Sequence, residues 1–273
     1  MRLTQAASIS LLASCTLAVP TAPSSSPSNH PHPSHPDTSI DDILPPIVPI
    51  NPRSGDPDFI RNLVTTATNG DRVALLDQPG DYIFDFNPAT APEAAVTTGQ
   101  GGSAVAANAK TFPSLIRNGA AMTLGFLDAC GMNTAHVHNR ATELNVVVKG
   151  RLVTNMVIEN GAAPIENTLE TFQMANFPQG SIHQQFNPDC EEMVFVAGFN
   201  SEDPGTGQIA QNFFNLRGDV VSATLGGVQT FDGRDLESFK EMIPANVALG
   251  IQACLDKCGL KRNAKRDLRE LVN

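Results

Sequence analysis

Residues 131–150 read GMNTAHVHNRATELNVVVKG and carry three side chains of the kinds that bind metals. His136 and His138 are separated by one residue, and on a strand such alternate side chains share one face. Glu143 follows a short turn, NRAT, and begins a valine-rich stretch that we expect to form a second strand running back beside the first. One carboxylate and two imidazoles would then point at the same place.

A second stretch, FPQGSIHQQFN at residues 177–187, supplies a fourth candidate ligand. Pro178 and Gly180 predict a turn, and a jelly roll would bring the following strand, with His183, beside the strand of His136. Three neutral imidazoles and one carboxylate suit a divalent transition metal and leave positions open for water, dioxygen or a chelating acid. An isolated His-x-His is more often an accident of a strand surface, but the joint pattern favours a metal site.

The remaining histidines do not compete with this set. His30, His32 and His35 lie in NHPHPSH, a Pro-rich segment with no core to fix ligand geometry. We therefore interpret them as part of a solvated linker rather than as a metal-binding tract. Every other histidine of the chain belongs to the two stretches above.

The composition predicts one main globular domain. The chain has 273 residues, of which 41% are hydrophobic, enough for one sizeable core. Its formal net charge of -10 repels phosphate backbones and argues against nucleic-acid binding. The sequence has no mononucleotide loop, nucleophile elbow or zinc-protease helix, which argues against the corresponding enzyme classes.

The N-terminal region predicts export. Residues 1–18 combine Arg2 with the apolar, small-residue run AASISLLASCTLA, which is typical of a secretory signal peptide. Residues 19–54 are rich in Pro and Ser, so we expect a flexible leader. No later stretch offers the roughly 20 uninterrupted apolar residues of a membrane span. We expect a secreted protein that is extracellular or lies in the cell wall.

Residues 55–235 are expected to form the folded domain. Between residues 82 and 228, short apolar runs alternate with Gly, Pro and Asn, which indicates many strands. No run before about residue 235 keeps a helical period for three turns. The pattern predicts an all-β domain, an antiparallel sandwich or barrel.

Residues 236–273 predict a C-terminal helical extension. Val247, Ile251 and Leu255 are four residues apart, and Gly259 follows them like a helix C-cap. The last residues, NAKRDLRELVN, predict one more short amphipathic helix with a solvated basic face.

The two histidine-bearing stretches resemble the two cupin motifs of germins. The first motif is a glycine, a spacer, His-x-His, a glutamate and a later glycine, and the second is Pro-x-Gly-x-x-His-x-x-x-Asn. The segment GFNSEDPGTGQ also resembles the germin segment after the second motif. The resemblance covers about residues 55–260 and points to a secreted, single-cupin germin-like or spherulin-like protein. The residues in register are His136, His138, Glu143, Gly150, Pro178, Gly180, His183 and Asn187.

This resemblance implies a cupin jelly-roll β-barrel that binds manganese. The implied ligands are His136, His138, Glu143 and His183, and the implied assembly is a trimer or hexamer built through the terminal helices. The residue types alone do not identify the metal as manganese, because iron, zinc, copper, nickel and cobalt also bind to related sets of nitrogen and oxygen ligands.

The resemblance also implies two substrate-positioning residues. In germins that oxidise oxalate, two asparagines near the metal hold the acid. One coincides with Asn133, and the other coincides with Thr123. A threonine hydroxyl still donates a hydrogen bond, but its reach is shorter and its geometry differs, which argues against oxalate oxidation.

Three further departures from the germin motifs fall in turns. Cys130 stands where germins have the first of two glycines, Phe172 stands where the second motif has Gly, and Asn139 replaces the proline after His-x-His. We expect these substitutions to alter the turns and to leave the ligands in place.

The cysteines predict two disulfides. Cys15 lies in the predicted signal peptide, and Cys130, Cys190, Cys254 and Cys258 remain as an even set with three complete connectivities. We favour Cys130 with Cys190, which would join the two ligand-bearing segments, and Cys254 with Cys258, at i and i+4 of the predicted helix. A cysteine metal site or a reactive thiol is the functional alternative.

Three functions fit these observations. A metal-dependent oxidoreductase that dismutes superoxide needs only a redox-active ion, an open coordination position and an access path. An enzyme that oxidises oxalate needs in addition a pocket for the dianion. A non-catalytic secreted protein of the wall, stress or encystment type would use the metal to stabilise its assembly.

Overall fold

The computed structural model describes residues 39–50, 53, 55–231 and 233–262. The chain divides into two units, residues 1–46 and 47–273, and each is described by itself. In the first unit, α1 (Ile40–Ile43) is a single helical turn. The predicted signal peptide, most of the predicted leader and the last predicted helix lie outside the described residues.

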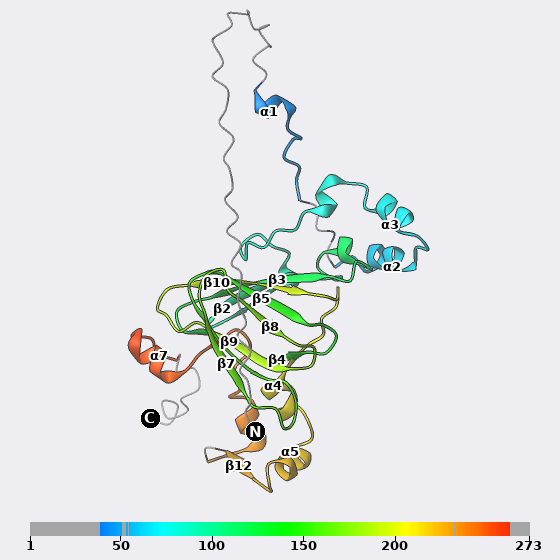
Figure 1. Cartoon of the computed structure of the whole chain (residues 1–273). Coiled ribbons are helices and arrows are strands. Elements are labelled where there is room, and N and C mark those ends of the chain that lie inside the picture. Colours follow the sequence, from blue (N-terminus) through cyan, green and yellow to red (C-terminus); the bar gives the residue numbers. More distant parts are fainter. Residues whose placement is uncertain (1–38, 51–52, 54, 232, 263–273) are drawn as a thin grey trace, which may run out of the picture. The chain divides into compact units, whose positions relative to one another are not determined.

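Two antiparallel sheets stack as layers in the second unit (Figure 1), which confirms the predicted all-β domain. The first sheet has the strand order β1 (Val96–Gly99), β2 (Gly102–Ala107), β3 (Ala121–Leu127), β10 (Met193–Phe199), β5 (Glu143–Lys149), β8 (Met174–Phe177). The second sheet has the order β11 (Thr206–Gln208), β4 (Gly131–His138), β9 (Ile182–Phe186), β6 (Leu152–Val157), β7 (Ile165–Leu169), and β14 (Ala248–Leu249) also pairs with β4.

The hydrophobic core lies between the sheets. In β10, Met193, Phe195, Ala197 and Phe199 are buried, while the residues between them are partly exposed. This alternation follows from the strand period of two, which gives each strand one face toward the core. Most of the remaining members of the core cluster come from the two sheets and include Leu127, Val147, Leu152, Met156 and Phe177.

Short helices interrupt the β-domain before residue 235. They are α2 (Pro57–Thr65), α3 (Asn69–Leu75), α4 (Ile209–Phe214) and α5 (Gly218–Thr224), together with the 3-10 turns η1 (Pro79–Tyr82), η2 (Glu93–Ala95) and η3 (Pro113–Leu115). The longest of these, α2, has 9 residues, so none reaches three turns. Side chains cap the N-termini of α2 and α3. The Asp56 side chain accepts from the N–H groups of Asp58 and Phe59, and Thr68 forms a capping box with Asp71.

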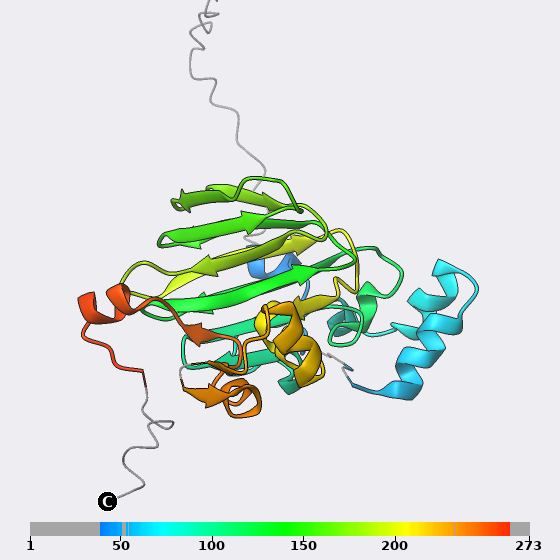
Figure 2. The ribbon, with the colours of Figure 1, turned by 90° about the horizontal axis from the view of Figure 1, so that it is seen from below.

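The C-terminal region is less helical than predicted. After the two-stranded pair β12 (Thr230–Phe231) and β13 (Arg234–Asp235), it forms α6 (Leu236–Lys240), β14 and α7 (Gln252–Lys257). The helix predicted across Val247 and Ile251 was wrong, because the backbone of Ala248 and Leu249 instead pairs with β4. Figure 2 shows this segment, drawn orange to red, running along the sheet toward α7. Gly259 follows α7 with a φ of +66°, as predicted for a helix C-cap.

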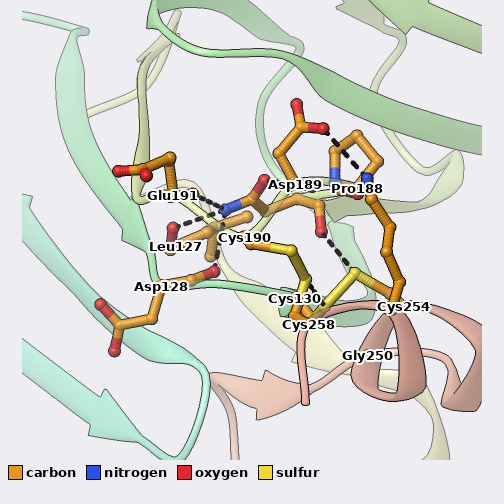
Figure 3. The surroundings of a disulfide bond; sticks show 12 residues. Leu127, Asp128, Cys130, Pro188, Asp189, Cys190, Glu191, Gly250, Cys254 and Cys258 are labelled. Carbon is orange, nitrogen blue, oxygen red and sulfur yellow. Dashed lines mark hydrogen bonds and ion pairs between the residues drawn. A yellow bond between two sulfur atoms is a disulfide. The ribbon is translucent and has the colours of Figure 1, made fainter. Parts of the chain in front are cut away.

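Two disulfides join α7 to the barrel (Figure 3). They pair Cys130 with Cys254 and Cys190 with Cys258, so the favoured connectivity was wrong. Cys254 and Cys258 lie one turn apart on one side of the helix, and each reaches a different partner. The Cys130 N–H donates to the Asp189 carbonyl over 3.1 Å. The two ligand-bearing segments are therefore neighbours, but a backbone hydrogen bond joins them instead of a disulfide.

Two of the three turns with unexpected residues have a backbone that favours glycine. Cys130 has a φ of 56° and Phe172 a φ of 69°, both in the left-handed region. The alteration of these turns relative to germins stays a prediction. Neighbouring bonds hold them, since Cys130 is in a disulfide and the Phe172 N–H donates to the Val147 carbonyl over 2.7 Å.

Within the part of the chain that the structure describes, no helix is long and apolar enough to cross a membrane.

Candidate metal centre

Four side chains converge between the two sheets. His136 and His138 come from β4, Glu143 from the start of β5 and His183 from β9. Their ligand atoms all lie within 4.8 Å of one another. Each of the four residues is at most 5% exposed. The structure thus brings together the residues that the sequence predicted to converge.

The route to this convergence differs from the prediction in one respect. β9 pairs with β4 and places His183 opposite His136, as expected for a jelly roll. β5 does not pair with β4; it lies in the other sheet, between β10 and β8. The expected return of β5 beside β4 was therefore wrong, and the turn between them passes from one sheet to the other. Glu143 faces the histidines across the sandwich.

A β-bulge in β4 adds Asn133 to the same face. Asn133 pairs with Gln185 and His136 pairs with His183, so three steps along β4 match two steps along β9. Strict alternation would have placed Asn133 and His136 on opposite faces. The extra residue turns the Asn133 side chain to the face of His136, as bulges do near functional sites.

Hydrogen bonds leave the Nε2 atom of each histidine facing the centre. Nδ1 of His136 lies 2.7 Å from the Thr134 carbonyl, and Nδ1 of His183 lies 3.0 Å from the Ser181 carbonyl. Because a carbonyl only accepts, both Nδ1 atoms carry the proton. Nδ1 of His138 lies 3.2 Å from the Thr206 hydroxyl, which can accept in the same way. Such partners fix ring orientation and tautomer in metal sites.

The two oxygens of Glu143 have different surroundings. Oε2 lies 2.9 Å from Nε2 of His138 and 3.1 Å from Nε2 of His183. Oε1 accepts hydrogen bonds from the side-chain amides of Asn145, over 2.9 Å, and Gln185, over 3.0 Å. One oxygen is thus held by amides, and the other is directed at the imidazoles.

Burial sets the charge state of this cluster. Burial first, and then the neighbouring His183, lower the pKa of His136 to about 3 against the opposing effect of Glu143. Burial alone would raise the pKa of Glu143, but its interactions with the imidazoles of His138 and His183 outweigh burial and hold this pKa below its ordinary value. A neutral imidazole and an ionised carboxylate are the forms that bind a metal.

Aromatic rings pack against the imidazoles from the core. Phe177 stacks on His183 with ring centroids 4.3 Å apart and planes 11° apart. Phe199 lies 4.7 Å from the ring of His138. These contacts restrict the rotamers of two candidate ligands, which gives the cluster a preformed geometry.

The surroundings of Nε2 of His138 fit a bound cation. Nε2 of His138 is buried and, among the described residues, has no hydrogen-bond partner, although Oε2 of Glu143 is close to it. A buried nitrogen without a directed partner is costly unless something else binds it. The donor set of three imidazole nitrogens and one carboxylate oxygen suits a divalent transition metal.

A cavity of about 400 Å³ opens onto the cluster. Thr123 and Asn133, the two predicted substrate-positioning residues, both line it, together with three of the four candidate ligands. Much of the remaining wall is small or aromatic, with Ala104, Ala197 and Phe199 among its members. Within the described residues, no lysine or arginine lines it.

Three residues near the cluster were not predicted from the sequence. Asn145 and Gln185 each lie two positions after a candidate ligand on the same strand, so strand alternation could have placed both on the inner face. Asn246 comes from the segment before β14, more than 50 residues beyond either motif, and no sequence signal connects it to the site.

The fold and the buried cluster together define a jelly-roll protein with a candidate metal site of three histidines and a glutamate. The family model described as Cupin matches residues 86–226, and the chain belongs to this family. The predicted cupin fold is thereby confirmed.

Among known relatives, the chain is similar to spherulins and germins. It is 38% identical to spherulin-1A of Physarum polycephalum over 208 residues, which are 76% of this chain and 81% of that protein. It is 29% identical to putative germin-like protein 3-2 of Oryza sativa subsp. japonica, over 70% of this chain and 89% of the relative. It is 24% identical to oxalate oxidase GF-2.8 of Triticum aestivum, over 70% and 88% of the two chains.

Proposed function

We propose that this chain is a secreted, metal-binding germin-like cupin whose metal, manganese, is held by His136, His138, Glu143 and His183. The observation that carries the proposal is the placement of four buried ligand atoms within 4.8 Å of one another. The hydrogen bonds of the Nδ1 atoms support it, because they direct Nε2 to the centre in all three histidines.

The proposed activity is a metal-dependent oxidoreductase reaction on a small molecule in the cavity. A bound manganese ion would supply one-electron chemistry and open coordination positions. Superoxide is the first candidate substrate, because it needs little from the wall beyond access. Oxalate is the second, supported by the similarity to oxalate oxidase GF-2.8 and by Asn133 in the wall. Against oxalate stand Thr123 and a wall whose described residues offer the dianion no cationic side chain.

A non-catalytic role is the alternative. The relatives at 38% and 37% identity are named spherulin-1A and spherulin-1B, and neither name states an activity. In this role the ion would stabilise the barrel, because a ligand that binds only the folded state raises its stability.

Two features support secretion and self-association. Two disulfides are typical of an oxidising compartment and agree with the signal peptide predicted for residues 1–18. The outer face of the first sheet exposes Met122 on β3, Leu144 on β5 and Met174 on β8. An apolar group on the outer face of one sheet suits a contact with a second copy, as a homotrimer or homohexamer requires.

The proposed activity is tested with protein reconstituted with Mn²⁺ and assayed against superoxide and against oxalate. His138→Ala serves as the variant that removes one ligand. Turnover of one substrate that disappears together with the metal in the variant supports the enzyme and selects its substrate. Bound metal without turnover of either substrate supports the non-catalytic role instead. Light scattering of the same samples determines the oligomer size.

A further inference from the structure

A chain of side-chain amides connects the C-terminal segment with Glu143. The Thr134 N–H donates to Oδ1 of Asn246 over 2.8 Å, and Nδ2 of Asn246 donates to Oδ1 of Asn133 over 2.7 Å. Nδ2 of Asn133 donates to Oε1 of Gln185 over 2.8 Å. Nε2 of Gln185 then donates to Oε1 of Glu143 over 3.0 Å. We call this series of hydrogen bonds the amide relay.

Both ends of the relay fix its direction. At one end, a backbone N–H can only donate, so Asn246 must present its oxygen to Thr134 and its NH₂ group to Asn133. Each following amide is then oriented by the one before it. At the other end, an ionised carboxylate can only accept, which agrees with the NH₂ group that Gln185 presents to Glu143. The donor end and the acceptor end thus require the same orientation of all three amides.

This direction determines which oxygen Glu143 offers to the histidines. Gln185 is fully buried and Glu143 is 1% exposed, so the hydrogen bond between them has no competition from solvent. Because Oε1 is occupied by amide donors, Oε2 remains directed at His138 and His183. The first residue of the relay touches a second ligand as well, since the Thr134 carbonyl accepts from His136.

The segment that carries Asn246 is held tightly against the barrel. The Gly101 N–H donates to the Val247 carbonyl over 3.1 Å, and Ala248 pairs with Met132 of β4. A Cβ atom on Gly101 would lie 1.9 Å from the Ala248 carbonyl oxygen, so only glycine permits this approach. Cys254, a few residues further on, is tied to Cys130 at the start of β4.

We propose that Asn246 is a positioning residue of the metal centre, acting through Asn133 and Gln185 to orient Glu143. The inference rests on the proposed metal site and assigns it a component from the C-terminal segment. It also gives Asn133 a structural task, because both its Oδ1 and its Nδ2 atoms have partners in the relay.

The test replaces Asn246 with aspartate. Asn246→Asp has nearly the same shape and still accepts from the Thr134 N–H, but it cannot donate to Asn133. The side-chain amides of Asn133 and Gln185 must then exchange their donor and acceptor ends, so that Gln185 presents its carbonyl oxygen to the Glu143 carboxylate. The affinity for Mn²⁺, measured by calorimetry, is expected to fall about tenfold or more, the usual effect of losing an outer partner of a ligand. The visible absorption spectrum of the Co²⁺-loaded variant is expected to change as well.

The sign of the change in Mn²⁺ affinity shows whether Asn246→Asp acts through the orientation of Glu143 or through its added charge. An added negative charge alone would strengthen the binding of a cation. Asn176→Asp adds the same charge on an exposed position of β8 and is expected to leave the affinity within about twofold of wild type. Asn133→Asp interrupts the relay at its next link and is expected to reproduce the loss. It also serves as the test if Asn246→Asp does not fold.

The outcomes distinguish the two proposals. Wild-type protein that binds Mn²⁺, with both relay variants binding it equally well and giving the wild-type Co²⁺ spectrum, would overturn the role of Asn246 and leave the metal site standing. Wild-type protein that binds no Mn²⁺ would overturn the proposed function and this positioning role together. In metal-free wild-type protein, the side-chain amide protons of Gln185 should exchange slowly; rapid exchange would contradict the relay itself.

Discussion

Nε2 of His183 lies 3.1 Å from Oε2 of Glu143, although 40 residues separate them and they belong to opposite sheets. The cluster exists only when the two sheets are closed on each other. His136 and Glu143 are buried in it together, and the protonation of these two groups is therefore coupled to the folding of the barrel.

The stability of the metal-free protein should decrease as the pH falls below about 6.5. Burial lowers the pKa of His136 from 6.5 to about 3, so between these values the unfolded chain binds a proton that the folded chain does not. The free energy of unfolding then falls by up to about 1.4 kcal/mol per pH unit for this one group. Glu143, with a pKa held below its ordinary value, adds to the loss at lower pH. Denaturant unfolding at a series of pH values measures the slope.

His136→Gln is the matched variant for this measurement, because glutamine does not titrate. Its slope between pH 6.5 and 4 should be shallower than that of the wild type. Equal slopes in the two proteins would show that His136 is not buried in its neutral form.

Local patterns predicted the candidate ligands, and long-range packing was harder to predict. Strand alternation was enough to place His136 and His138 on one face, and the turn before His183 predicted the strand that follows it. The sequence does not reveal that β5 joins the other sheet, because a four-residue turn can end in either layer. The bulge that turns Asn133 inward and the return of Asn246 from the C-terminal segment depend on tertiary contacts that no periodicity records.

Thr123→Asn should increase oxalate oxidation by the manganese-loaded protein. Thr123 lines the cavity where the germin resemblance places an asparagine. A donor of longer reach adds one hydrogen bond to a charged acid, worth about 1.5–3 kcal/mol, so kcat/KM for oxalate should rise by roughly tenfold or more. Thr123→Val, which has the shape of threonine without the hydroxyl, should not show the gain. No difference between the two variants would argue against oxalate binding at this wall.

Tryptic peptide mapping of the non-reduced protein should recover two crosslinked pairs. Cleavage after Lys257 separates Cys254 from Cys258, so every connectivity gives a distinct set of masses. The expected pairs are Cys130 with Cys254 and Cys190 with Cys258. A peptide that joins Cys254 to Cys258 would contradict the anchoring of α7 described above. Digestion with free thiols blocked prevents exchange between the bridges.

Phe172→Gly should stabilise the protein by about 1 kcal/mol. Phe172 is 82% exposed and has a φ of 69°, so its side chain gains little from packing while its backbone is strained. Phe172→Ala removes the same ring but keeps a Cβ atom, and it should not share the gain. Thermal unfolding of the three proteins measures the difference, and equal stability of the Gly and Ala variants would exclude the backbone explanation.

The metal content of the protein tests the central claim most directly. Wild-type protein reconstituted with Mn²⁺ and then dialysed should retain about one ion per chain by elemental analysis. Glu143→Gln should lose most of it, while Glu159→Gln, the same change at an exposed position, should retain it. A wild-type protein that holds no ion, or a Glu143→Gln variant that holds as much as the wild type, would contradict the account.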